Sequence, residues 1–240
     1  MEIRIFEDAA SLGLAAADIF AEQLKKNGAS VLGLATGASP VPTYNRLIEM
    51  YKAGEISFKD VVTFNLDEYC DLPKDDKNSY YTFMHENLFN HVDIQESNVH
   101  ILDGNAEDTE QEAAAFDAAI KAAGGIDIQL LGIGNNGHIG FNEPSNEFTT
   151  GTFKVKLTDS TLQANSRYFD ENPMPHYALT MGVGSIMDAK KIVLIATGPA
   201  KAQAIFDTVK GEVTPLVPAS ILQKHPDAVL LLDKAAASLL

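Results

Sequence analysis

Short apolar segments recur along the chain, separated by stretches in which apolar residues have helical spacing. The apolar segments are nearly continuous, which is typical of strands covered on both faces of a sheet. The predicted strands are Ile3–Phe6, Val31–Ala35, Val61–Asn65, Ile126–Ile133, Tyr177–Met181, Lys191–Thr197 and Ala228–Leu232. The predicted helices are Ala9–Lys26, Pro42–Lys52, Ser79–Asn90, Glu107–Ala123 and Pro199–Lys210. This alternation predicts an α/β fold of Rossmann-like type, with a mostly parallel open sheet flanked by helices.

The sequence predicts a single domain over residues 1–240. Hydrophobic residues make up 45% of the chain, enough for one buried core and too many for a disordered protein. The polar stretch Phe141–Thr161 has little regular periodicity, so we expect a binding loop or a lid there, with the possible lid at 141–175.

Charge and cysteine content narrow the classes of partner. The chain has 18 Lys and Arg against 33 Asp and Glu, a formal charge of −15, and so has no general attraction for nucleic acid or anionic membranes. Cys70 is the single cysteine and fits a reducing compartment. The first residues lack a signal-peptide pattern, and no apolar stretch approaches the ~20 residues of a membrane span. We therefore expect a cytoplasmic protein.

The loop after the second predicted strand has the composition of a phosphate-binding loop. Thr36, Gly37, Ala38 and Ser39 are small residues between a strand and a helix, so backbone N–H groups can approach an anion closely. The alternative is a tight turn in which Ser39 only caps the helix.

Two adjacent acids, Asp67 and Glu68, follow the third predicted strand. Open α/β sheets bind ligands at the carboxyl ends of their strands, and a carboxylate there can remove a proton next to a carbonyl. Because neighbouring residues point in different directions, we expect at most one of them to face a ligand. The alternative is a solvated acid that caps a helix.

Residues Gly132–Gly137 match the spacing G-x-G-x-x-G of dinucleotide-binding loops. That fingerprint requires a helix to begin at its third glycine, whereas Gly140 and Pro144 follow closely here. We therefore reject a dinucleotide site.

The same loop carries Asn136, His138 and Glu143. A histidine can transfer protons near pH 7, and a carboxylate can fix its tautomer. A His138 that bonds only to backbone, or a metal site from His138, Glu143 and Asp67, are the alternatives. The metal site has few ligands, and we predict none.

Two cations follow these loops. Arg167 could bind phosphate through its planar guanidinium group. Lys201 is predicted in the first turn of a helix, where a cation opposes the helix dipole unless an anion lies nearby. We expect both to bind an anionic ligand.

Taken together, these segments resemble the glucosamine-6-phosphate deaminase family. The resemblance runs from about residue 31 to 226, and the segment His138–Pro144 is its most specific part. The matching segments are Leu34–Pro40, Phe64–Tyr69, Leu131–Pro144, Ala164–Phe169, Thr197–Ala202 and Pro218–Pro226.

The resemblance implies a sugar-phosphate isomerase/deaminase fold, glucosamine 6-phosphate as substrate, and no metal or cofactor. It implies that His138 assists opening of the sugar ring with Glu143 and Asn136, and that Asp67 moves a proton between C2 and C1. It implies phosphate binding by Gly37, Ala38, Ser39, Arg167 and Lys201.

The chain also departs from the family. Some members carry Asp where Asn136 stands, so Asn136 can orient groups but cannot relay a proton. Residues 150–155 offer only Lys154 as a basic residue, and the long C-terminal tail of allosteric members is lacking. We therefore expect a monomer or small homo-oligomer, with neither a hexamer nor allosteric activation by an amino-sugar phosphate.

Two other functions remain as alternatives. A 6-phosphogluconolactonase shares the fold family, but its Gly-His loop continues differently from Phe141–Pro144. A non-catalytic sugar-phosphate sensor would accompany a DNA-binding helix-turn-helix, which we do not find, and Asp67, His138 and Glu143 are all present.

Overall fold

The protein is built around a seven-stranded sheet in which every strand pairing is parallel. The computed structural model describes residues 1–166, 169 and 173–240. The strands β2, β6 and β10 are buried along their whole length, as their continuous apolar character predicts. The predicted α/β fold is confirmed. In spatial order the strands are β1 (Glu2–Phe6), β10 (Ala228–Asp233), β9 (Lys191–Ala196), β6 (Ile128–Leu131), β2 (Val31–Leu34), β3 (Val62–Asn65) and β5 (Val99–His100).

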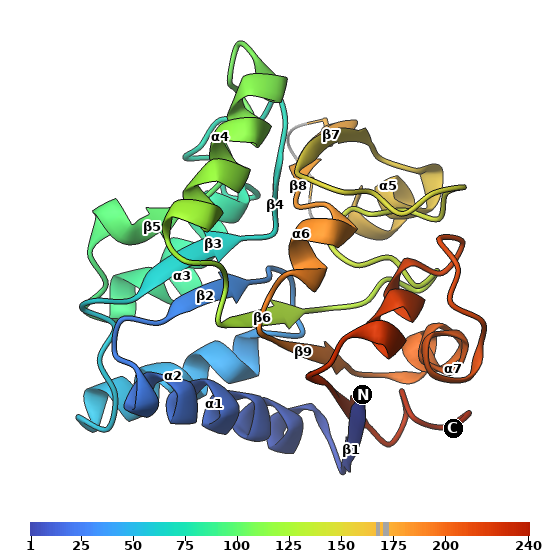
Figure 1. Ribbon diagram of the computed structural model, residues 1–240, viewed down its shortest axis with the longest axis horizontal. Coiled ribbons are helices and arrows are strands. Elements are labelled where there is room, and N and C mark those ends of the chain that lie inside the picture. Colours follow the sequence, from blue (N-terminus) through green and yellow to red (C-terminus); the bar gives the residue numbers. More distant parts are fainter. Residues whose placement is uncertain (167–168, 170–172) are drawn as a thin grey trace.

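Helices cover both faces of this sheet, with α1 and α2 on one side and α4 on the other (Figure 1). Helix α1 begins at a capping box formed by Asp8 and Ser11 and ends at Asn27. No helix of the described residues is long and apolar enough to cross a membrane. The α-helices are α1 (Ala9–Lys26), α2 (Val41–Lys52), α3 (Tyr80–Asn87), α4 (Thr109–Ala122), α5 (Asp159–Asn165), α6 (Val183–Met187) and α7 (Ala202–Lys210); the 3-10 helices are η1 (Phe89–His91), η2 (Glu96–Asn98), η4 (Pro199–Lys201) and η5 (Pro218–Lys224).

A second, three-stranded antiparallel sheet lies beside the main one, with the order β4 (Asp67–Tyr69), β8 (Tyr177–Thr180) and β7 (Phe153–Lys156). The predicted strand Tyr177–Met181 therefore belongs to this sheet and not to the parallel one. Strand β7 lies inside the stretch Phe141–Thr161, where we expected little regular structure. Its four residues alternate between half-buried and exposed, a pattern too short to identify a strand from sequence.

The strand order reverses between β2 and β6. From β2 the chain adds β3 and β5 on one side, whereas β6, β9 and β10 extend the sheet on the other. The loops that leave the carboxyl ends of β2 and β6 therefore diverge and leave a crevice between them. Ligands of open α/β sheets bind at such a reversal, so the topology itself indicates where the site lies.

Candidate functional site

A cavity of about 190 Å³ opens at this reversal of strand order. An adjoining hollow of about 200 Å³ shares Ile133, Gly134, His138 and Asn165 with it. The two hollows together form one concave region above the carboxyl ends of β2 and β6. The cavity is lined by Ala35, Thr36, Gly37, Ala38, Ser39, Leu66, Asp67, Tyr80, Gly132, Ile133, Gly134, His138, Gly140, Phe141 and Asn165.

The predicted phosphate loop forms one wall of the cavity. Gly37 has a φ of +91°, a conformation that residues with a Cβ rarely adopt, so the loop turns sharply there. Helix α2 begins at Val41, and its N-cap residue Pro40 makes no side-chain cap hydrogen bond. The alternative that Ser39 caps this helix is therefore wrong. Ser39 instead lines the cavity, close to the positive end of the helix dipole.

Asp67 lies at the start of β4, and its side chain is buried but borders the cavity. Burial, followed by the neighbouring charge of Glu68, raises the pKa of the Asp67 carboxyl to about 8. Among the described residues, none forms a hydrogen bond or ion pair with this carboxylate. A carboxylate without compensating donors is a stronger base than an ordinary aspartate, which suits removal of a proton from carbon.

This burial predicts an unusual dependence of stability on pH. The pKa of Asp67 is about 8 in the folded state, whereas an unfolded aspartate titrates near ~3.9. The native state therefore holds more protons between these values, and the free energy of unfolding falls as pH rises through that window. We expect Asp67→Asn to be more stable than wild type, by a margin that grows from pH 5 to pH 8 by up to about 1.4 kcal/mol per pH unit.

Urea denaturation at several pH values measures this margin. Asp18→Asn is the matched control, because Asp18 is an exposed aspartate on α1. A margin for Asp67→Asn that stays constant with pH would contradict the raised pKa.

Glu68 points away from the cavity, as alternation along a strand requires. Its carboxylate accepts hydrogen bonds from the backbone N–H groups of Tyr69, Tyr80 and Tyr81, at 2.8 to 2.9 Å. Burial raises the pKa of Glu68 to about 7, although these donors oppose the rise. Glu68 thus fixes the start of α3, which brings Tyr80 into the cavity wall. The expectation that at most one of the two acids faces the ligand agrees with this arrangement.

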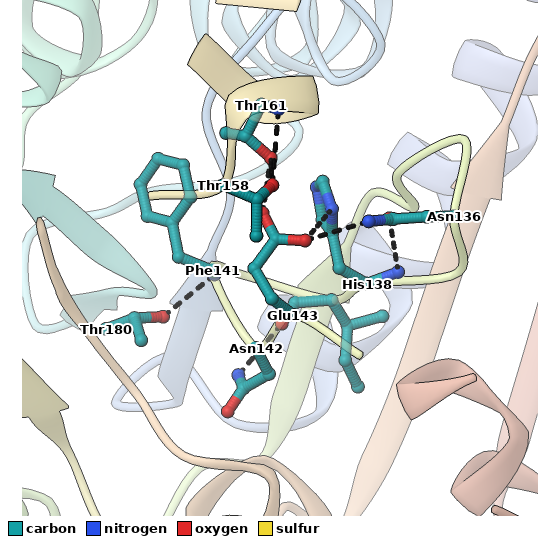
Figure 2. Close-up of polar contacts among 9 residues, drawn as sticks. Asn136, His138, Phe141, Asn142, Glu143, Thr158, Thr161 and Thr180 are labelled. Carbon is teal, nitrogen blue, oxygen red and sulfur yellow. Dashed lines mark hydrogen bonds and ion pairs between the residues drawn. The ribbon is translucent and has the colours of Figure 1, made fainter. Parts of the chain in front are cut away.

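His138, Glu143 and Asn136 come together as the sequence predicts (Figure 2). His138 Nδ1 lies 3.4 Å from Glu143 Oε2, which also accepts a 2.8 Å hydrogen bond from Asn136 Nδ2. The second carboxylate oxygen, Oε1, accepts a hydrogen bond from the Thr161 hydroxyl. Burial alone would raise the pKa of Glu143, but its three polar neighbours outweigh burial and lower the pKa to about 2. Glu143 is therefore a permanent anion beside the His138 ring at neutral pH.

The glycine-rich loop that carries His138 contains no helix. After β6 the next regular element is β7, so the rejection of a dinucleotide-binding helix is confirmed. Gly137 and Gly140 have φ values of +84° and +55°, which let the chain reverse direction twice. The Phe141 N–H donates to the Thr180 hydroxyl of β8 at 3.0 Å, which fixes the loop against the second sheet.

Gly134 leaves space for the His138 ring. A Cβ at residue 134 would lie 2.3 Å from His138 Cε1, so Gly134→Ala must displace the ring. We expect kcat to fall about 100-fold, because a displacement of about 1 Å can cost that much. The melting temperature should change little, because a side chain yields and not the backbone. Gly28→Ala is the control, since a Cβ there meets nothing within 4 Å. Full activity of Gly134→Ala would show that the position of the ring is not critical.

The structure describes only one of the two predicted cations. Lys201 lies in η4, directly before α7, and borders the adjoining hollow. Arg167 falls outside the described residues. Among the residues that the structure describes, no three His, Cys, Asp or Glu side chains gather into a candidate metal site.

Sequence reasoning did not identify four residues of the site. Tyr80 and Asn165 line the cavity, Thr161 bonds Glu143, and Thr180 holds the loop. They come from α3, α5 and β8, and among them only Asn165 lies in a segment that resembles the family, Ala164–Phe169. Their role depends on tertiary contacts that only the fold creates.

Comparison with known proteins places this geometry in a family. Residues 7–231 match the family described as glucosamine-6-phosphate isomerases/6-phosphogluconolactonase. A glucosamine-6-phosphate deaminase of Alkaliphilus oremlandii (strain OhILAs) is 51% identical over 241 residues, covering 100% of both chains. One of Thermoanaerobacter pseudethanolicus (strain ATCC 33223 / 39E) is 54% identical over 226 residues, covering 94% of this chain and 89% of the relative.

Solved structures agree. A monomeric glucosamine-6-phosphate deaminase superimposes with a TM-score of 0.97 at 42% identity, covering 100% of both chains. The 6-phosphogluconolactonase of Trypanosoma brucei reaches a TM-score of 0.76 at 20% identity, covering 100% of this chain and 98% of its own, a likeness of fold alone. The chain therefore belongs to the glucosamine-6-phosphate isomerase and 6-phosphogluconolactonase family, on its glucosamine-6-phosphate deaminase branch.

Proposed function

We propose that this protein converts glucosamine 6-phosphate and water into fructose 6-phosphate and ammonia. One observation carries the proposal: a buried carboxylate that pairs with no other described residue lines the same cavity as a histidine held by a second carboxylate. Isomerisation requires these two groups, one acting on the ring oxygen and the other on the carbon acid. The deaminases that match this chain along nearly its whole length support the same reaction.

The phosphate would bind at the wall made by residues 36–39. Backbone N–H groups of Gly37, Ala38 and Ser39 and the hydroxyls of Thr36 and Ser39 would donate to its oxygens, at the positive end of α2. Lys201 borders the adjoining hollow and would add a positive charge. For Arg167 the same role is proposed from the family resemblance alone. Binding at a group remote from C1 and C2 positions the reacting carbons.

Ring opening would be the task of His138. The ring oxygen needs a proton as the C1–O5 bond breaks, while the C1 hydroxyl loses one. Glu143 holds an anion at Nδ1, which leaves Nε2 to exchange protons with the substrate. Asn136 bonds the same carboxylate oxygen and orients it without titrating.

Asp67 would carry out the isomerisation. Its carboxylate removes the proton from C2 of the open-chain aldehyde while the aldehyde oxygen takes up a proton from solvent, giving an enolamine with a double bond between C1 and C2. Returning the proton to C1 produces an iminium at C2. Water adds to C2, and ammonia leaves with the C2–N bond to give the ketone of fructose 6-phosphate. These steps balance without an electron acceptor, so we propose no cofactor.

The proposal extends to the metabolic role, the cellular compartment and the oligomeric state of the protein. Ammonia release makes the net reaction a hydrolysis of the C2–N bond, in amino-sugar catabolism, and the buried free thiol of Cys70 suits the cytoplasm. The similar solved structure is described as monomeric, which supports a monomer here. The possible lid over residues 141–175 stays a prediction.

A product assay tests the function. Purified protein with glucosamine 6-phosphate and EDTA should release ammonia and fructose 6-phosphate in equal amounts. The same protein should not hydrolyse 6-phosphogluconolactone above the spontaneous rate. Lactone hydrolysis without ammonia release would replace the deaminase with the lactonase. Phosphosugar binding without either product would favour the sensor.

A further inference from the structure

Helix α5 contacts both halves of the proposed catalytic machinery. At its first turn, Thr161 is buried, and its hydroxyl donates a hydrogen bond to Glu143 Oε1. At its last residue, Asn165 Nδ2 donates to the Tyr69 hydroxyl at 3.1 Å. Tyr69 lies on β4, two residues after Asp67. The helix therefore joins the loop of the histidine to the strand of the aspartate.

The two carboxylate oxygens of Glu143 contact different elements, the glycine-rich loop and helix α5. Oε2 faces His138 and Asn136 of the glycine-rich loop, whereas Oε1 faces Thr161 (Figure 2). A carboxylate that is hydrogen-bonded at only one oxygen can still rotate about the Cγ–Cδ bond of the glutamate side chain. Such a rotation changes the direction in which the carboxylate faces the His138 ring. A donor at the second oxygen removes that freedom.

Thr161 is itself held in place. Its backbone N–H and hydroxyl contact the Thr158 hydroxyl at 3.4 and 3.2 Å, so Thr158 caps α5 and orients Thr161 at the same time. The side chain touches the Glu143 carboxylate and does not line the main cavity, so we expect it to act on the reaction mainly through Glu143. Thr161 does border the adjoining hollow, beside His138 and Lys201.

We propose that Thr161 is a positioning residue that fixes the Glu143 carboxylate, and through it the His138 ring, for ring opening. Asn165 anchors the other end of α5 to the strand of Asp67, so that one short helix sets both acid–base groups relative to each other. This inference rests on the proposed deaminase function and adds to it a residue that no local sequence pattern indicates.

The test is a double-mutant cycle of Thr161 and His138 in the full-length protein. Thr161→Val keeps the shape but removes the donor, and should lower kcat about 10- to 100-fold with KM changed less than about threefold. In the His138→Gln background the same substitution should lower kcat less than about twofold, because the group it positions is gone. Thr161→Ser restores the hydroxyl and should recover most of kcat. Equal losses in both backgrounds would overturn the proposal.

Controls separate positioning from folding. Gln163→Val places a β-branched residue on the exposed face of the same helix, and should leave kcat near the wild-type value. If Thr161→Val does not fold, Thr161→Ala enters the cycle instead. The ring signals of His138 in NMR spectra should shift in Thr161→Val and return in Thr161→Ser, a readout independent of turnover. Unchanged signals would overturn the proposal. Wild type without ammonia release would instead reject the deaminase function itself.

Discussion

Replacing Asp67 with asparagine should lower kcat about 1,000-fold, the middle of the range for loss of a general acid–base group. Asparagine keeps the size and polarity of the side chain but cannot accept the C2 proton or return it to C1. KM should change little, because the proposed phosphate-binding residues 36–39 lie on another wall of the cavity. Initial rates of ammonia release measure both constants.

The matched control is Asp18→Asn, which removes one negative charge from the exposed face of α1 and should retain full activity. In wild type, kcat/KM should rise as pH approaches the pKa of Asp67 at about 8, because only the ionised carboxylate acts as a base. Asp67→Asn activity within tenfold of wild type would assign the proton transfer to another group.

The same side chain links activity to stability. A carboxylate buried without donors costs folding free energy once ionised, so the substitution that removes activity should also stabilise the fold at neutral pH. Glu68 shows the opposite arrangement. Three backbone N–H groups donate hydrogen bonds to its carboxylate, which thereby fixes the start of α3. Two adjacent acids thus have different tasks because the strand turns them to opposite sides.

The sequence predicts the parallel sheet well, for a physical reason. Strands buried on both faces, such as Leu230 and its neighbours in β10, are nearly continuous apolar runs. Two strands of the second sheet, β4 and β7, are not predictable in this way. Strand β4 begins at Asp67 and Glu68, which read as a loop, and β5 of the parallel sheet, with only two residues, also escapes prediction. These strands form because a partner strand pairs with them, and the partner cannot be identified from the local sequence.

Site prediction divides along the same line. Loops that follow buried strands are visible in sequence, and so Thr36–Ser39, Asp67 and His138 could be named and do line one cavity. Glu143 and Asn136 follow because they lie within a few residues of the histidine. Thr161, Asn165 and Tyr80 reach the site from helices elsewhere in the chain, and their roles depend on which helix face the fold turns inward. Their contribution is a tertiary property.

His138→Gln should lower kcat by about 100-fold or more, because glutamine can hydrogen-bond the ring oxygen but cannot exchange a proton with it. Substrate molecules whose ring opens spontaneously remain usable, since Asp67 is intact. Added imidazole should therefore recover part of the rate if it enters the cavity. His91→Gln, at an exposed histidine in η1, is the control and should keep full activity.

An isotope effect then distinguishes ring opening from proton abstraction. With deuterium at C2 of the substrate, wild type should react more slowly, because the C2 proton transfer by Asp67 contributes to the rate. In His138→Gln ring opening becomes the slow step, and it breaks no bond to that deuterium, so the isotope effect on kcat should fall toward unity. An isotope effect that stays large despite the loss of rate would mean that His138 acts together with Asp67 at C2. The acid–base groups on β4 and on the glycine-rich loop would then serve one step and not two.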